Sequence, residues 1–376
     1  MIERFLEETL IQYCGKGKAI LLYGPRQAGK TTLINRVLEK VDAKHLYLSG
    51  DEYDVRKMLE GASSTKLRNL VSGYDTICID EAQKINDIGN IIKLFTDSIP
   101  EVQVLATGSS SFELHNRTSE SLTGRKYEQI LLPFSFGELR THFGPLEEKR
   151  KLEQRLVYGS YPEIVMKPEE ADELIRSLVE SYLYKDILIV ENYRHFSMLE
   201  KLVEALAYQV GSEVSYSELS RLVGIDGKTV EKYLYLLEQA FIVFRLPAMS
   251  GNLRTEIRKG KKYYFYDNGV RNAIVGDLQP LHRRSDIGIL WENYIVSERK
   301  KFLLYSQSHT KSFFWRTVQQ QEVDYIERGV EGHSAWEIKW SPRAKVVLPT
   351  TFTNQYGPIE TGVVHEGNYE EFLLPK

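Results

Sequence analysis

The sequence predicts an α/β protein that begins with a helix-covered parallel sheet, continues through a helical region and ends in a second α/β domain. Over the first 110 residues, apolar runs alternate with helical patterns, as in parallel sheets. After about residue 255, strand-like and helix-like segments are mixed. With 376 residues, the chain exceeds the size that one core usually supports. We therefore predict three domains, over residues 1–140, 141–252 and 253–376.

The composition is that of a globular protein, with 42% hydrophobic and 27% charged residues. The net charge of −3 gives no global positive field, so any contact with nucleic acid has to come from local basic patches. The two cysteines, Cys14 and Cys78, are far apart, which argues against a disulfide framework and a zinc site. No signal peptide or membrane-spanning run is readable, so we expect a cytoplasmic protein without a membrane partner.

The first domain should contain at least four parallel strands. The apolar runs that predict them lie at 18–23, 45–48, 76–80 and 102–108. A helical pattern of apolar residues over 88–95 separates the last two, and another follows the first strand.

A phosphate-binding loop connects the first strand to its helix. Residues 24–32, GPRQAGKTT, match the pattern G-x-x-x-x-G-K-[ST]. Glycines let the loop curl so that its N–H groups face phosphate oxygens, while Lys30 reaches the β- and γ-phosphates and Thr31 can ligate Mg²⁺. We therefore predict ATP and Mg²⁺ as ligands. The residues predicted to bind the nucleotide here are Gly24, Pro25, Arg26, Gln27, Ala28, Gly29, Lys30, Thr31 and Thr32.

Two further strand ends complete the predicted nucleotide site. TICIDE (76–81) places Asp80 where it can hold Mg²⁺ and Glu81 where it can act as a general base on water. In VLATGSSS (104–111), Thr107 and Ser109 are candidates for contacting the γ-phosphate, although they also suit a simple turn.

These motifs together resemble the AAA-type ATPases of bacteria and archaea. The shared segments are GPRQAGKTT, DEAQ (80–83), TGSS (107–110), LTGR (122–125) and PFSFGE (133–138). The resemblance implies a P-loop ATPase that forms homo-oligomers, in which Arg125 acts at the nucleotide of a neighbouring copy. The alternative for Arg125 is an anchor that holds a strand through a carboxylate.

A helix-turn-helix is predicted over 215–239. Ser215 and Glu218 form a capping box, and Gly224 provides the turn between the helices. The apolar positions predicted to face the core are Leu219, Leu222, Val223, Val230, Tyr233, Leu234 and Leu237. The strand FIVFRL (241–246) would add a wing. This module either contacts DNA through residues such as Arg221, Lys228, Thr229 and Lys232, or serves as a joint between protein parts.

The last domain should combine a helix over 287–303 with strands at 312–317, 322–327 and 334–340, after a linker at 253–262. On two of these strands, Asp324 and Glu337 can point into one pocket, with Lys339 on the same face as Glu337. Two carboxylates that hold Mg²⁺ and a lysine that orients water suit phosphodiester hydrolysis. Glu292, on the helix, could complete this site.

A helical Glu, a strand Asp and Glu-x-Lys on the next strand resemble the restriction-endonuclease-like fold. The resemblance implies a catalytic set of Glu292, Asp324, Glu337 and Lys339 that acts on DNA or RNA. The alternatives are a nuclease-like fold without activity, or a hairpin with two solvated carboxylates. Two functions follow: an ATPase that controls a nuclease-like tail, or an ATP-dependent switch that binds DNA or protein.

Overall fold

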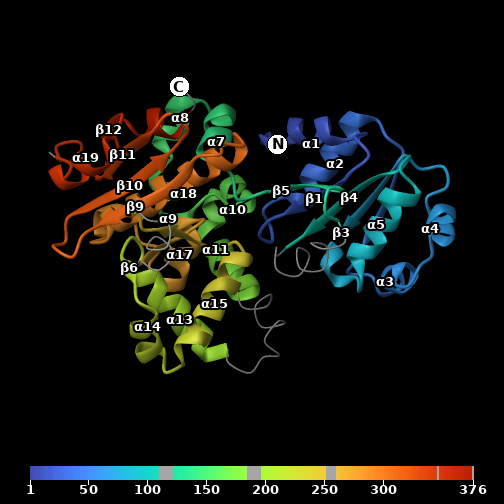
Figure 1. Ribbon diagram of the computed structural model, residues 1–376, viewed down its shortest axis with the longest axis horizontal. Helices are drawn as coiled ribbons and strands as arrows, with labels where there is room; N and C mark the ends of the chain where they lie inside the picture. The colour runs from blue at the N-terminus through green and yellow to red at the C-terminus, as the bar shows by residue number, and fades with distance from the viewer. Residues whose placement is uncertain (110–121, 184–195, 251–259, 345–346, 375–376) are drawn as a thin grey trace. The chain divides into compact units, whose positions relative to one another are not determined.

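The computed structural model divides into two compact units (Figure 1). Unit 1 comprises Met1–Phe134 and Gln239–Phe241, and unit 2 comprises Ser135–Glu238 and Ile242–Lys376. The structure describes residues 1–109, 122–183, 196–250, 260–344 and 347–374.

A five-stranded parallel sheet forms the centre of unit 1, in the order β2-β3-β4-β1-β5. Its strands are β1 (Ala19–Tyr23), β2 (His45–Ser49), β3 (Thr76–Asp80), β4 (Gln103–Gly108) and β5 (Lys126–Ile130). The first four lie where the apolar runs predict them, whereas β5 was not predicted, because its residues KYEQI are mostly polar. Because all strands are parallel, the ends of β1, β3 and β4 meet at one edge of the sheet.

The helices of unit 1 are α1 (Leu6–Tyr13), α2 (Lys30–Val41), α3 (Tyr53–Leu59), α4 (Ser64–Leu70), the 3-10 helix η1 (Ala82–Lys84) and α5 (Ile88–Ser98). Two of them, α2 and α5, lie where the sequence predicts them, and the other helices were not predicted. Helix α5 buries Ile88, Ile91, Ile92 and Phe95, the stripe that its sequence pattern predicts. Both α2 and α5 pack against β4, so the central strands are buried.

Unit 2 begins with short helices. They are α7 (Phe136–Phe143), α8 (Pro145–Arg150), α9 (Leu152–Tyr158), α10 (Pro162–Met166), the 3-10 helix η2 (Pro168–Glu170), α11 (Ala171–Leu178) and the π-helical turn η3 (Val179–Leu183). Ser135 and Glu138 form a capping box at the start of α7. A buried, two-pronged ion pair joins Arg155 of α9 to Glu148 of α8, with N–O distances of 2.7 and 2.9 Å.

A winged-helix arrangement follows in unit 2. Its elements are α13 (Phe196–Tyr208), β6 (Glu213–Val214), α14 (Tyr216–Val223), α15 (Gly227–Gln239), β7 (Val243–Pro247) and β8 (Lys261–Phe265). The strands form an antiparallel sheet in the order β6-β8-β7. The prediction that Leu222 faces the core is wrong, because its side chain is 64% exposed. Leu219 and Val223, one helical turn apart, form the buried stripe of α14 and leave Leu222 at its edge.

The end of unit 2 contains a four-stranded mixed sheet in the order β12-β11-β10-β9. Strands β9 to β11 are antiparallel, and β12 pairs parallel to β11. The elements are α17 (Asn268–Val275), η4 (Leu281–Arg283), α18 (Ile287–Tyr305), β9 (Lys311–Arg316), β10 (Glu322–Arg328), β11 (His333–Ile338), α19 (Thr350–Tyr356), β12 (Glu360–Val364) and α20 (Tyr369–Leu373). Of the predicted linker, residues 253–259 lie outside the described residues, and Lys261 and Lys262 belong to β8.

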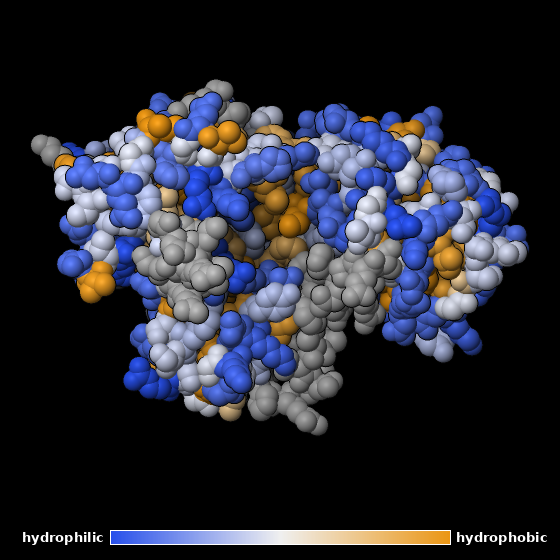
Figure 2. All heavy atoms as spheres, viewed as in Figure 1, coloured by the Kyte–Doolittle hydropathy of each residue, from blue (hydrophilic) through white to orange (hydrophobic). Residues whose placement is uncertain are grey.

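Polar residues cover most of the face shown in Figure 2, with hydrophobic residues visible between them. Several of the most exposed hydrophobic side chains, Val318, Val330 and Val347, are single residues far apart in the sequence. Among the described residues, no helix has both the length and the apolar content that a bilayer crossing requires.

Gly24→Ala is expected to destabilise unit 1. Gly24 has φ +152°, and a Cβ there would lie 2.0 Å from the Leu131 carbonyl oxygen, so the loop and β5 would have to separate. We expect a loss on the order of 2 kcal/mol or more in the free energy of unfolding. Gly15→Ala is the matched control, because Gly15 also has positive φ but open space around it. Equal thermal unfolding midpoints for the two variants would contradict this account.

Candidate functional site

The phosphate-binding loop lies between β1 and α2, as predicted, and its backbone is strongly curled. Gly24, Gln27 and Gly29 all have positive φ, at 152°, 59° and 92°. Pro25 and Ala28 are buried, whereas Arg26 and Gly29 are half-buried and Gln27 and Thr32 are exposed. This conformation lets consecutive N–H groups form a concave anion site above the start of α2.

Two cationic side chains fix the loop. The buried ammonium of Lys30 donates hydrogen bonds to the carbonyls of Gly24 at 2.8 Å and Pro25 at 2.9 Å. The buried guanidinium of Arg4 donates to the carbonyls of Ala28 at 3.0 Å and Leu132 at 2.5 Å. Arg4 therefore ties the loop to the segment after β5, a role that no sequence motif indicates.

Asp80, at the end of β3, is the centre of a hydroxyl network. Its Oδ2 accepts hydrogen bonds from Thr31 at 2.9 Å and from Tyr47 at 2.5 Å, and its Oδ1 accepts one from Thr107. Burial by itself would raise the pKa of Asp80, but these hydrogen bonds outweigh it and hold the pKa below its usual value. The two residues predicted to ligate Mg²⁺ in unit 1, Thr31 and Asp80, are thus in direct contact, with Asp80 ionised.

Glu81 follows Asp80 in a left-handed conformation, with φ 48°. Its backbone N–H donates to the Thr107 hydroxyl at 3.1 Å. The side-chain amide of Gln83 donates both to Oε2 of Glu81 at 2.7 Å and to the hydroxyl of Ser109 at 3.0 Å. Buried Gln83 thereby joins the predicted general base to the predicted γ-phosphate contact, a link between β3 and β4 that the sequence does not show.

Arg125 lies away from this network. It precedes β5 at the amino edge of the sheet, beside Ala19, whereas the phosphate loop leaves β1 at the opposite edge. Its guanidinium pairs with Asp97 of α5 at 2.6 Å, which is the arrangement of a strand anchor. An action of Arg125 on ATP would therefore need the nucleotide site of a second copy.

In unit 2, Asp324, Glu337 and Lys339 converge on one pair of strands. The pairing of β10 with β9 shifts between Val323 and Ile326, so Asp324 lies in a β-bulge, which re-aims its side chain. Oδ2 of Asp324 accepts hydrogen bonds from the backbone N–H of Ile338 at 2.9 Å and from Lys339 at 2.8 Å. The Lys339 ammonium also lies 3.0 Å from Oε2 of Glu337.

Glu292 joins this group from α18. Its Oε1 accepts a hydrogen bond from the Tyr264 hydroxyl at 2.7 Å and lies 3.5 Å from the ammonium of Lys262. Lys262, on β8, is 1% exposed and also pairs with Glu322 at 2.5 Å. Electrostatic interactions couple Asp324 to both Glu292 and Lys262. We call Lys262, Glu292, Glu322, Asp324, Glu337 and Lys339 the carboxylate–lysine cluster.

The cluster splits the pKa values of its two central acids. Burial, then the charge of Asp324, raises the pKa of Glu337 to about 7. Burial would also raise the pKa of Asp324, but Lys339, the Ile338 N–H and the charge of Lys262 together outweigh this effect and keep the pKa below its usual value. Asp324 and Glu337 are only 7% and 6% exposed, so the alternative of two solvated carboxylates is wrong. Among the described residues, no three acidic, histidine or cysteine side chains are arranged to hold a metal ion.

The winged helix presents cations to solvent at Arg221, Lys228 and Lys232. Thr229, a candidate for base contact, instead donates its hydroxyl to Asp226 at 2.6 Å. Asp226 also accepts hydrogen bonds from the backbone N–H groups of Lys228 and Thr229. The Asp226 side chain therefore caps the start of α15.

Three family models match successive parts of the chain. Residues 16–140 match an AAA domain, residues 149–280 match a domain of unknown function (DUF8612), and residues 287–373 match another domain of unknown function (DUF4143). The chain therefore contains an AAA-type P-loop ATPase domain followed by two domains of unknown function.

Similar proteins extend over most of the chain. An uncharacterized protein of Mycobacterium tuberculosis is 26% identical over 83% of this chain and 68% of its own length. One from Haemophilus influenzae is 25% identical over 73% of each chain. A Walker-type ATPase structure from Pyrococcus abyssi has a TM-score of 0.46 and 15% identity, covering 72% of this chain and 93% of that one. A Holliday junction branch migration motor of Thermotoga maritima has a TM-score of 0.33 and 16% identity, covering 65% and 90%.

Lys262→Met is expected to destabilise unit 2, because it leaves the carboxylates of Glu292 and Glu322 without their shared counterion. We expect a loss of about 3 kcal/mol in the free energy of unfolding at neutral pH. Denaturant titration in the presence of a metal chelator measures this loss. Removing the lysine raises the pKa of Glu292 further, so the loss should shrink as the pH falls and the carboxyl becomes neutral. Lys149→Met, at an exposed position of α8, is the control. Equal stability of both variants would contradict the role of Lys262.

Proposed function

We propose that this protein binds ATP with Mg²⁺ in unit 1 and hydrolyses it, with Glu81 as the general base. The contact between Thr31 and an ionised Asp80, directly beside Glu81, carries this proposal. It brings the loop that would hold the phosphates to the strand end that would hold the metal ion. The match of residues 16–140 to an AAA domain supports the same activity.

Each group has a defined task in this proposal. The curled loop and Lys30 would bind the phosphates, with the ammonium exchanging the carbonyls of Gly24 and Pro25 for phosphate oxygens. Thr31 and Asp80 would hold Mg²⁺, which, when bound, neutralises charge on the phosphates. Glu81 would take the proton of the attacking water. Gln83, which is hydrogen-bonded to both Glu81 and Ser109, would position the Glu81 carboxylate.

Glu81→Gln is expected to abolish turnover while ATP binding is retained. Gln cannot accept the proton of water, so kcat should fall by about 100-fold or more. Phosphate release and nucleotide affinity measured on the full chain separate the two effects. Glu101→Gln, which changes an exposed acid at the opposite edge of the sheet, should keep the wild-type rate. Wild-type turnover by Glu81→Gln would exclude Glu81 as the base.

We propose metal-assisted phosphodiester hydrolysis as a second activity, carried by the carboxylate–lysine cluster in unit 2. The supporting observation is the half-exposed Lys339 ammonium in contact with the buried carboxylates of both Asp324 and Glu337. Asp324 and Glu337 supply the oxygen ligands that Mg²⁺ prefers, and Lys339 can orient water or stabilise developing negative charge. Glu292, from the helix α18 that precedes β9, would complete the set that the restriction-endonuclease-like resemblance implies.

A regulatory switch is the competing function for unit 2. The absence of a ready three-ligand metal site among the described residues favours it, because the cluster would then hold α18, β8, β10 and β11 together without chemistry. The exposed cations of α14 and α15 would contact DNA, or the winged helix would join protein parts. Cleavage of DNA or RNA that depends on the cluster would distinguish the nuclease function from the regulatory switch.

Full-length protein is expected to cleave DNA or RNA with Mg²⁺ or Mn²⁺, with or without ATP. Glu337→Gln and Lys339→Ala should each lower the cleavage rate by about 100-fold or more, since both remove groups from the proposed chemistry. Glu331→Gln, an exposed acid between β10 and β11, should retain wild-type cleavage. If wild type cleaves neither polymer, or if Lys339→Ala cleaves as fast as wild type, the nuclease function is wrong.

A further inference from the structure

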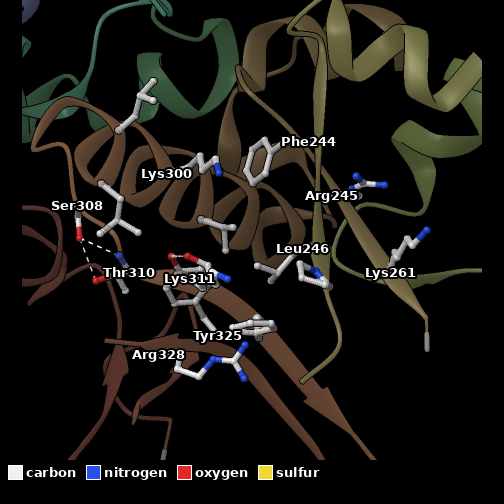
Figure 3. Close-up of a pocket in the computed structure, with 16 residues that line it drawn as sticks. Phe244, Arg245, Leu246, Lys261, Lys300, Ser308, Thr310, Lys311, Tyr325 and Arg328 are labelled. Carbon is white, nitrogen blue, oxygen red and sulfur yellow. Dashed lines mark hydrogen bonds between the residues drawn. The ribbon is translucent and has the colours of Figure 1, made fainter. Parts of the chain in front are cut away.

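A pocket of about 590 Å³ lies within unit 2, apart from the carboxylate–lysine cluster (Figure 3). Its walls come from β7 and β8 of the winged helix, from α18, and from β9 and β10 with the turn before them. Phe244 and Leu246 of β7 face this pocket, whereas Arg245 and Lys261, which also border it, direct their charged ends to the other face of β7 and β8.

The charged residues that line the pocket are all cationic. They are Arg245, Lys261, Lys300, Lys311 and Arg328, and no carboxylate is among the lining residues. Lys300 projects from α18 on one side, Lys311 and Arg328 lie on the strands opposite, and Arg245 and Lys261 lie toward the winged-helix side (Figure 3). The side chains of Arg245 and Lys261 point away from the space, toward Glu238 and Tyr216, so positive charge faces it from two opposing walls.

The protein neutralises the charges of these five cations unequally. Arg245 lies 3.5 Å from Glu238, and Lys261 donates to the Tyr216 hydroxyl at 3.3 Å. The side chains of Lys300 and Lys311 make no ion pair or hydrogen bond with any described residue. Burial lowers the pKa of Lys300 below its usual value, and the charge of Glu238 only partly opposes this effect. Two lysines, Lys300 and Lys311, held on facing walls without counterions destabilise the ligand-free protein, which is typical of a binding site.

The remaining lining defines the ligand further. Phe244, Leu246, Val296, Leu303 and Phe313 form apolar walls, and Ser308, Thr310 and Ser312 add hydroxyl groups. The volume lies in the range of sites for small organic ligands. Cations on opposing walls favour a ligand with more than one negative charge, such as a phosphate group. The apolar walls favour a ligand that also has an apolar part, which loses its hydration on binding.

We propose that this pocket binds a nucleotide unit through its phosphate, either a free mononucleotide or the 5′-phosphorylated end of a single strand. The cations would hold the phosphate, the hydroxyl groups would accept or donate to the sugar, and the apolar walls would receive the base. This site is distinct from the phosphate-binding loop, and it does not require hydrolysis by either proposed centre.

The test uses full-length protein that carries Lys30→Ala, which removes the phosphate-binding ammonium of unit 1. AMP and a 5′-phosphorylated hexathymidylate are titrated separately by calorimetry at low salt without divalent ions. We expect binding of at least one probe, and we expect Lys300→Ala combined with Lys311→Ala to weaken it about tenfold or more. Comparable affinity for both probes identifies a mononucleotide site, and binding of the oligonucleotide alone identifies a strand-end site.

Lys149→Ala is the matched control, because it removes one exposed lysine elsewhere in unit 2. Thermal unfolding checks that the double variant is folded, and Lys300→Gln with Lys311→Gln, which keeps part of each stem, replaces it otherwise. The proposal is overturned if neither probe binds, if adenosine binds as tightly as AMP and the oligonucleotide does not bind, or if the lysine pair can be removed without loss of affinity.

Discussion

The convergence of three hydroxyl groups on Asp80 is the constraint on which the nucleotide site depends. Thr31 comes from α2, Tyr47 from β2 and Thr107 from β4, so one carboxylate connects three elements that surround β3. Hydrogen bonds to a charged group contribute about 1.5–3 kcal/mol each, which is enough to hold the end of β3 against α2. The same hydrogen bonds keep Asp80 ionised, and an ionised acid in this place is what a magnesium site requires.

In unit 2, the main electrostatic feature is the group of charges in the carboxylate–lysine cluster. The cluster contains four carboxylates and two lysines, and each lysine contacts two of the acids. Such an arrangement satisfies buried charge locally, yet it leaves Glu337 with a pKa of about 7, poised between neutral and ionised forms. A divalent ion would favour the ionised form, so the same geometry suits either a structural core or a metal-dependent centre.

Local sequence signals predicted the parts of the fold that are periodic or carry a motif. The phosphate loop, the first four strands and the pair of helices around Gly224 lie where the sequence places them. Strand β5 was missed because it is an edge strand with polar residues, and Leu222 was misplaced because a helix of eight residues leaves its stripe poorly defined. The contributions of Arg4, Tyr47 and Lys262 depend on strand order and on contacts between distant segments. No local pattern records such contacts.

The central claim is that the curled loop and Asp80 form a working site for ATP with Mg²⁺. Titration calorimetry of ATP into folded full-length protein, with and without Mg²⁺, tests it most directly. We predict one ATP bound per chain, with higher affinity when Mg²⁺ is present, and no binding by Lys30→Ala at the same concentrations. Folded wild-type protein that takes up no ATP with Mg²⁺ present would contradict the account.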